Sequence, residues 1–167
     1  MDSRMTSSPG ALKQLLAAIT PLGEDAFRHR CKLLPGGTVG GHVRHCIEFY
    51  QCLFEGIGAG EVNYDARRRN ADIESCPQIA CQTIQHILST DWERIESLPH
   101  DLPLLVKESL QGRQQSSLGR ELGFAFSHTI HHLALIGMLL RDHGRAVADE
   151  IGLAPSTARH FTQQTAG

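Results

Sequence analysis

The apolar residues of this chain recur at helical spacing, and this periodicity constrains the fold more than any other feature of the sequence. Between Pro9 and Ile19, three leucines and an isoleucine fall at i, i+3, i+4 and i+7, which places them on one face of a helix. We find no run of sustained two-residue alternation, which would be typical of half-buried strands. The sequence therefore predicts an all-α fold.

Four long helices are expected, each bounded by residues that favour helix ends. Thr38 is a suitable N-cap for the second helix and Ser116 or Ser117 for the fourth, while Pro77 is acceptable only in the first turns of the third. The expected ranges are 9–19, 39–54, 72–95 and, after the serine N-cap, up to 142. Residues 102–110 are compatible with either an extended segment or a helical turn.

These segments predict one domain over residues 1–167, a four-helix bundle with long connections and a tail, residues 145–167, packed on the bundle.

The 16 Lys and Arg against 18 Asp and Glu give a net charge of −2, which argues against a whole-surface nucleic-acid or anionic-membrane binder. The longest apolar run, residues 133–140, is far shorter than the roughly 20 residues of a membrane span.

The N-terminus lacks the apolar core of a secretory signal, so we expect a cytoplasmic protein. The five cysteines form no C-x-x-C pair, and their odd number does not indicate a disulfide framework. Reduced thiols are expected. Among them, Cys46 is interpreted as a small buried residue and not as a metal ligand.

Five of the ten histidines lie in two short windows, and this clustering is the main functional signal. They are His42 and His45 in GGHVRHCIEF, and His128, His131 and His132 in FSHTIHHLALIG. His128 and His132 are one helical turn apart, the spacing at which a helix presents two imidazoles to one metal ion. Their helix is apolar nearly all round, so it should be buried.

A third imidazole from the second helix would complete a site with three protein ligands and open positions. Spacing alone does not choose between His42 and His45, although a helical wheel places His42 slightly nearer the middle of the apolar stripe. The alternative interpretation is that these are core or rim histidines bonded to backbone or carboxylate groups. For the clustered residues together, the metal interpretation is favoured.

The segment TVGGHVRH at residues 38–45, followed by His128-x-x-x-His132, resembles the DinB/YfiT-like superfamily of metal-binding four-helix bundles. The resemblance extends in order and spacing over about residues 10–142. It implies that His45 joins His128 and His132 as a ligand of a divalent metal, zinc or nickel, and that the protein is a homodimer. Thr129 stands where one common form of the family has the Glu of H-E-x-x-H, so metalloprotease chemistry is not expected.

The resemblance implies a metal-dependent enzyme acting on a small molecule, a thiol or an electrophile. Thiol S-transferase chemistry is slightly favoured over hydrolysis, because a bound metal lowers the pKa of a thiol or of water. His42 and His131 are the candidate catalytic residues, placed to orient a substrate or relay a proton. The alternative is a non-catalytic metal-binding or interaction bundle.

Three carboxylates, those of Glu48, Glu121 and Asp65, are candidates to accept the second N–H of the ligating imidazoles. The basic run Arg67 to Arg69 is compatible with binding of an anionic cosubstrate, and equally with a solvated loop holding one structural Arg–Asp pair.

Residues 146–160 imitate part of a helix-turn-helix, with Pro155 at the start of its second helix. DNA binding through this stretch is a lesser alternative, because Asp149 and Glu150 offset Arg145 and Arg159. We therefore expect no nucleic-acid partner and no membrane partner.

Overall fold

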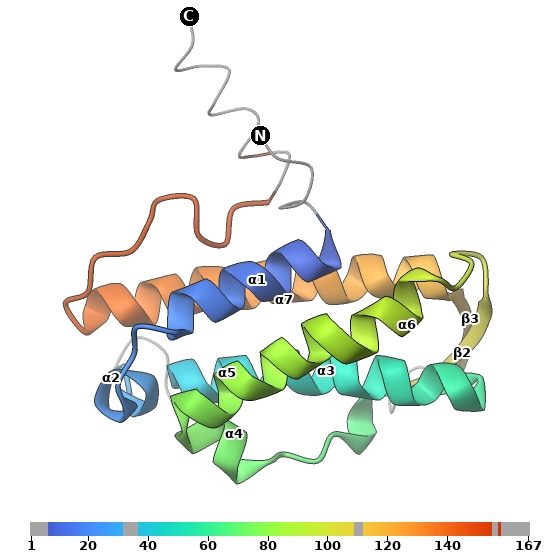
Figure 1. The fold of residues 1–167 in the computed structure, drawn as a ribbon, viewed down its shortest axis with the longest axis horizontal. Coiled ribbons are helices and arrows are strands. Elements are labelled where there is room, and N and C mark those ends of the chain that lie inside the picture. Colours follow the sequence, from blue (N-terminus) through green and yellow to red (C-terminus); the bar gives the residue numbers. More distant parts are fainter. Residues whose placement is uncertain (1–6, 32–36, 109–111, 155–156, 158–167) are drawn as a thin grey trace, which may run out of the picture.

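A computed structural model of the chain describes residues 7–31, 37–108, 112–154 and 157, and it is mostly helical with a small three-stranded sheet (Figure 1). The helices are α1 (Ser8–Ile19), α2 (Glu24–Arg28), α3 (Val39–Ala59), α4 (Ala71–Ser75), α5 (Pro77–His86), α6 (Trp92–Glu96) and α7 (Leu118–Asp142), with a 3-10 turn η2 (Tyr64–Ala66) and a π-helical turn η3 (Ile87–Asp91). The strands are β1 (Glu61–Asn63), β2 (Pro103–Glu108) and β3 (Gly112–Ser117). The predominance of helix is confirmed, whereas the expectation of a purely all-α chain is wrong.

The two predicted caps are present at the two longest helices. The Thr38 hydroxyl accepts the Gly41 N–H at 2.9 Å and begins α3, and Ser117 accepts the Arg120 N–H at 3.4 Å and begins α7. Helix α3 continues past its expected end and stops at Gly60, which adopts a left-handed φ of 72°. Burial of its apolar face outweighs the low helix propensity of the four glycines within it.

The third predicted helix is instead a series of shorter helices. The chain leaves helical geometry at Cys76, and Pro77 takes the first position of α5, where its missing N–H costs no hydrogen bond. Helix α5 then widens into the π-helical turn η3 before α6. Helix α2, which places Phe27 in the core, was not predicted either.

The long helices enclose one apolar core. Helix α7 packs against α1 and α3, and α5 packs against the same two helices. Figure 1 shows α7 alongside α1, with α3 in the layer beside α5. Each of these helices contributes fully buried side chains, among them Leu15, Ile47, Ile84 and Leu133. Helix α7, at 25 residues, is long and apolar enough to cross a membrane by length and composition, but 44% of its most apolar window is buried inside the protein.

The small sheet lies at the end of the molecule where α3 ends and α7 begins (Figure 1). Strand β2 is central, parallel to β1 and antiparallel to β3. Leu104 and Val106 are buried and Leu105 is exposed, so burial alternates along β2 although all three residues are apolar. Because the residue types do not alternate, the sequence of residues 102–110 did not distinguish a strand from a helical turn. Residues 109 and 110 of this segment lie outside the described residues.

Residues 145–154 run along α7 as turns and irregular backbone. Val147 and Ile151 pack against the core beside Gly137, and Gly152 approaches the backbone of Ala134. The described part of the helix-turn-helix-like stretch therefore forms no helix before Ala154, and Pro155 lies outside the described residues.

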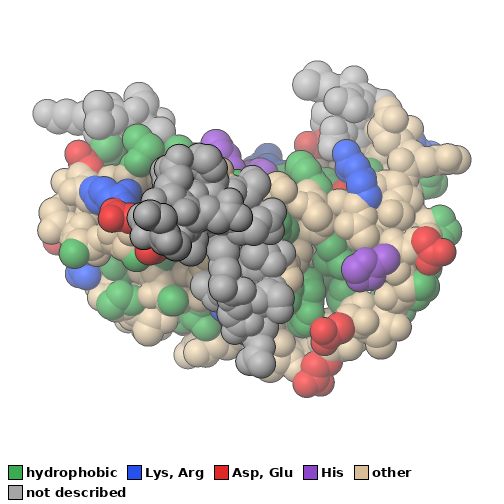
Figure 2. Space-filling model, turned by 90° about the horizontal axis from the view of Figure 1, so that it is seen from above, with side chains coloured by type: hydrophobic (Ala, Val, Ile, Leu, Met, Phe, Trp, Pro, Cys, Tyr) green, Lys and Arg blue, Asp and Glu red, His purple; other side chains and the backbone are tan. Residues whose placement is uncertain are grey.

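On the face drawn in Figure 2, acidic and basic side chains are interspersed, in keeping with the low net charge.

The close approach of α3 to α4 generates a prediction about Gly40. A Cβ atom at this position would overlap the carbonyl oxygen of Glu74 and the ring of Phe27, whereas one at Gly58 in the same helix would meet nothing within 4 Å. Gly40→Ala should lower the free energy of unfolding by about 1–3 kcal/mol through overpacking. Gly58→Ala should leave it unchanged or raise it by up to about 1 kcal/mol. Urea unfolding followed by circular dichroism measures both, and equal stabilities would contradict this packing.

Candidate metal centre

Three histidines from two helices converge at one point. His45 on α3 and His128 and His132 on α7 each offer a ring nitrogen, and these nitrogens lie within 4.8 Å of one another. The ring centres are 4.9 Å apart for His45 and His128, 4.7 Å for His45 and His132, and 4.5 Å for His128 and His132. We refer to these three residues as the histidine triad. It is the ligand set expected from the sequence.

The separation of the triad nitrogens can be compared with a metal site. Ligand nitrogens about 2.0–2.1 Å from a tetrahedral zinc ion lie roughly 3.4 Å apart. The triad is therefore somewhat wider than a closed site. The Nε2 atom of His128 is buried and has no hydrogen-bond partner among the described residues. An orphaned buried nitrogen costs about 1–3 kcal/mol, so a cation at this point would satisfy it.

His42 lies behind the triad and not in it. Its Nδ1 atom is 2.8 Å from Nδ1 of His132, and its own Nε2 is buried without a partner. A hydrogen bond between these two atoms requires one ring to carry its proton on Nδ1 and the other to leave Nδ1 free. His42 therefore fixes the orientation of His132, and leaves the opposite nitrogen of His132 free to bind a cation.

His131 is exposed, and its ring centre lies 5.3 Å from that of His132. It is thus beside the triad on the solvent side. The structure brings both candidate catalytic residues, His42 and His131, next to the triad. It gives His42 a contact that the spacing in the sequence could not show, because the partner is 90 residues away.

Burial keeps these imidazoles neutral. Desolvation is the main cause that lowers the pKa of His132 to about 3 and the pKa values of His45 and His128 to about 4. Neighbouring histidines add to the effect, and Arg67 contributes at His45 and His128. The pKa of His42 is lowered by burial and then by His131. Neutral imidazole is the form that binds metals, so the cluster does not have to lose protons first.

Aromatic rings form one wall of the site. Phe49 stacks on His128 with ring centres 4.2 Å apart and meets His45 edge-on at 4.8 Å. Tyr64 stacks on Phe49 at 4.8 Å, and Phe124 packs against both. These contacts limit the rotation of the triad rings on this side. This wall could not be predicted from the sequence, because Phe49 and Tyr64 look like ordinary core residues.

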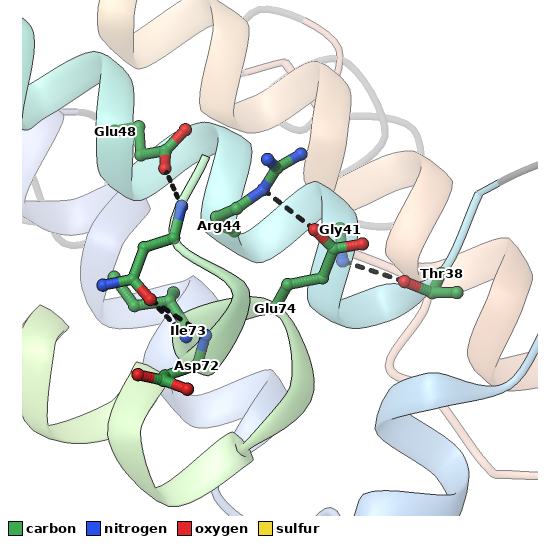
Figure 3. Close-up of polar contacts among 8 residues, drawn as sticks. Thr38, Gly41, Arg44, Glu48, Asp72, Ile73 and Glu74 are labelled. Atoms are coloured by element: carbon green, nitrogen blue, oxygen red, sulfur yellow. Dashed lines mark hydrogen bonds and ion pairs between the residues drawn. The ribbon is translucent and has the colours of Figure 1, made fainter. Parts of the chain in front are cut away.

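Polar contacts anchor the first half of α3 to the segment that follows η2 (Figure 3). Arg44 forms an ion pair with Glu74 at 3.3 Å, and Glu48 accepts the Asn70 N–H at 2.8 Å. Asn70 in turn caps α4 by accepting the Asp72 N–H. Because Arg44 and Glu48 flank His45 in sequence, these bonds fix the height and rotation of α3 at the ligand.

Two of the three carboxylates expected to support the ligands are used elsewhere. Glu48 bonds to Asn70, and Glu121, which is fully buried, accepts hydrogen bonds from Tyr64 at 2.8 Å and from Ser116 and Arg120. The expectation that Glu48 or Glu121 supports an imidazole is therefore wrong. At His132, the hydrogen-bond partner of the ligating imidazole is another histidine, His42.

The structure also shows the surroundings of the cysteines and of the basic loop near the triad. Cys46 is completely buried, and burial raises its pKa to about 12, so its thiol is unsuited to metal binding. None of the five cysteines, all of which lie in the described residues, forms a disulfide. In the basic loop, Arg68 pairs with Glu55 at 2.6 Å, whereas Arg67 donates to the Tyr64 carbonyl and lies over the Phe49 ring.

Comparison with known proteins finds a curated relative. FK506-binding protein 5 of Rhizopus delemar is 31% identical to this chain in an alignment of 163 residues that covers 93% of this chain and 37% of the relative. The chain thus spans little more than a third of the length of that relative. No family model matches the chain, and no solved structure matches it.

This finding corrects the assignment made from the sequence. The relative carries the name of a different family, so the DinB/YfiT-like resemblance is wrong. The expected thiol-transferase or hydrolase activity depended on that resemblance and is contradicted with it. The misassignment had a physical origin: a histidine near a helix start and an H-x-x-x-H pair are short patterns that unrelated helical proteins can share.

The bond between His42 and His132 can be tested directly. In His42→Phe, the His132 ring loses its fixed partner, so it should exchange between its two neutral tautomers. Long-range proton–nitrogen NMR spectra of the imidazoles should show one dominant tautomer for His132 in the unaltered protein and averaged shifts in the variant. His131→Phe is the matched control and should leave the His132 signals nearly in place. A tautomer of His132 that is indifferent to His42 would contradict the assigned contact.

Proposed function

We propose that this chain is a binding domain that holds one divalent transition-metal ion, zinc or nickel, through His45, His128 and His132. The observation that carries the proposal is the convergence of three neutral imidazoles from α3 and α7, with the buried Nε2 of His128 lacking any partner among the described residues. Imidazole nitrogen is a preferred ligand of zinc and nickel. Within the part of the chain that the structure describes, no carboxylate or thiolate joins this set, which disfavours magnesium and calcium.

Three protein ligands leave at least one coordination position for another molecule. Bound at the triad, the metal would supply a positive charge and an open position for such a ligand. The residues around it have separable roles: His42 orients His132, Phe49 packs on the rings, and the contacts of Arg44 and Glu48 hold α3 in place. We assign no catalytic step to this site.

Metal binding would also stabilise the fold, because its ligands come from different helices. Helices α1 and α3 each pack against both α5 and α7, and this arrangement supports a four-helix bundle with long connections. In this bundle α5 and α6 together count as one of the four helices. In such a bundle an ion bound by residues of α3 and α7 would link two neighbouring helices. The stabilisation would follow mass action and grow with metal concentration.

The relative suggests a second candidate, binding of FK506. It is named for that property, and the aligned region covers nearly all of this chain. A groove of about 570 Å³ lies between α1, the end of α7 and residues 146–151, and it is lined by apolar side chains such as Leu140 and Val147. Its volume is within the usual range of small-molecule sites, about 300–1,000 Å³. This groove is where we would place such a ligand.

The metal proposal predicts stoichiometric zinc binding that depends on each triad residue. Calorimetry on the metal-free chain should give one ion per chain. His45→Ala, His128→Ala and His132→Ala should each weaken binding by about 100-fold or more, because loss of a direct ligand costs at least as much as loss of an outer partner, which is about 10–100-fold. His131→Ala is the control and should stay close to the unaltered protein. Full affinity in all three triad variants would refute the site.

The second candidate predicts saturable binding of FK506 to the isolated chain, measured by calorimetric titration. Ala17 is exposed on α1 at the wall of the groove, so Ala17→Trp should obstruct the groove without disturbing the core. This variant should reduce FK506 affinity at least tenfold, about 1.4 kcal/mol. Absence of binding to the unaltered chain would exclude this candidate, and undiminished binding to Ala17→Trp would move the ligand to another surface.

A further inference from the structure

Two arginines lie over the aromatic wall of the metal centre: Arg120 is over Phe124 and pairs with Glu121, whereas Arg67 is over Phe49. Arg67 follows η2, and its guanidinium carbon lies 5.0 Å from the centre of the Phe49 ring. That same ring contacts both His128 and His45. Arg67 therefore shares the Phe49 ring as a neighbour with two of the three triad residues. In sequence it is more than 20 residues from His45 and about 60 from His128.

The contacts of Arg67 leave most of its hydrogen-bonding capacity unused. One terminal nitrogen donates to the carbonyl of Tyr64, and the guanidinium lies over the Phe49 face. The ion pairs within the described residues include Arg68 with Glu55 and Arg44 with Glu74, but none that involves Arg67. A guanidinium has five N–H donors in a fixed fork, so Arg67 keeps donors for a further partner.

The electrostatics of the site favour a negative partner. Imidazole is neutral when it binds a metal ion, and the two buried carboxylates among the described residues, Glu48 and Glu121, are bonded to Asn70 and to the cluster around Tyr64. A divalent ion at the triad together with the Arg67 guanidinium would place three positive charges in a half-buried site. Such a charge is costly away from bulk water unless an anion accompanies it.

We infer that the metal centre takes a small oxyanion, a carboxylate or phosphate group, which binds the open metal position and is held by Arg67. The inference rests on the proposed metal function and adds the class of its ligand. Carboxylate and phosphate suit both partners, because their oxygens can bind a metal and also accept the parallel N–H donors of a guanidinium. Phe49 fixes the plane of the guanidinium through the cation–π contact.

The test uses the full chain loaded with cobalt(II), whose visible absorption reports changes in its ligands, and titrates it separately with acetate and with inorganic phosphate. At least one anion should give a saturable spectral change. Arg67→Gln should raise its dissociation constant about tenfold or more, and Arg67→Lys, which keeps the charge but loses the fork, should lie between the two. Arg68→Gln, a neighbour that pairs with Glu55, is the matched control and should change the constant less than about twofold.

The outcomes separate the two proposals. Cobalt uptake in all variants, with anion affinity that does not depend on Arg67 or no anion binding at all, overturns the oxyanion inference and leaves the metal site intact. Failure of the unaltered chain to take up cobalt overturns the metal function and the inference with it. Circular dichroism of each variant checks that the loss of the Phe49 contact has not unfolded the chain; Arg67→Lys with normal structure and unaltered anion affinity would count against the inference.

Discussion

The packing of α3 against α7 is the contact on which the rest of the site depends. Each helix alone carries histidines that could equally be surface residues, and only their contact places His45 opposite His128 and His132. Apolar residues supply the energy of this packing, since Val43, Ile47 and Tyr50 on α3 and Leu133 and Ile136 on α7 are completely buried. This packing buries His132 and half-buries His45 and His128, and their burial also keeps the three imidazoles neutral.

The surroundings of the triad show how a polar site is held in an apolar helical framework. Aromatic rings fill the space on one side, and the Thr38 cap and the Arg44–Glu74 pair fix the start of α3 on the other. His132 receives its orienting bond from His42, so the direct support of this ligand is uncharged. Arg44 and Arg120 are paired with Glu74 and Glu121, so a bound cation and Arg67 would add positive charge that no described carboxylate pairs with, and an accompanying anion follows from the same geometry.

The sequence predicted those features that repeat along a helix or depend on local chemistry. The starts of α3 and α7 followed from Thr38 and Ser117, and the shared face of His128 and His132 followed from their four-residue spacing. Features set by distant contacts escaped prediction. Strand β2 was ambiguous because Leu105 is apolar yet exposed, the break at Cys76 was masked by helical periodicity on both sides, and the partner of His132 lay on another helix. The choice of His45 over His42 came from a resemblance that the comparison contradicts, so only the three-dimensional arrangement supports it.

The most direct test of the central claim is the position of an ion in the folded chain. Anomalous diffraction at the zinc edge, from crystals of the zinc-loaded protein, locates the metal independently of any assumption about its ligands. The account predicts one strong peak with nitrogen ligands from His45, His128 and His132 at about 2.0–2.1 Å, and with Arg67 on the side of the remaining ligand. A peak bound by other residues, or no peak at the triad when zinc is present in excess, would contradict it.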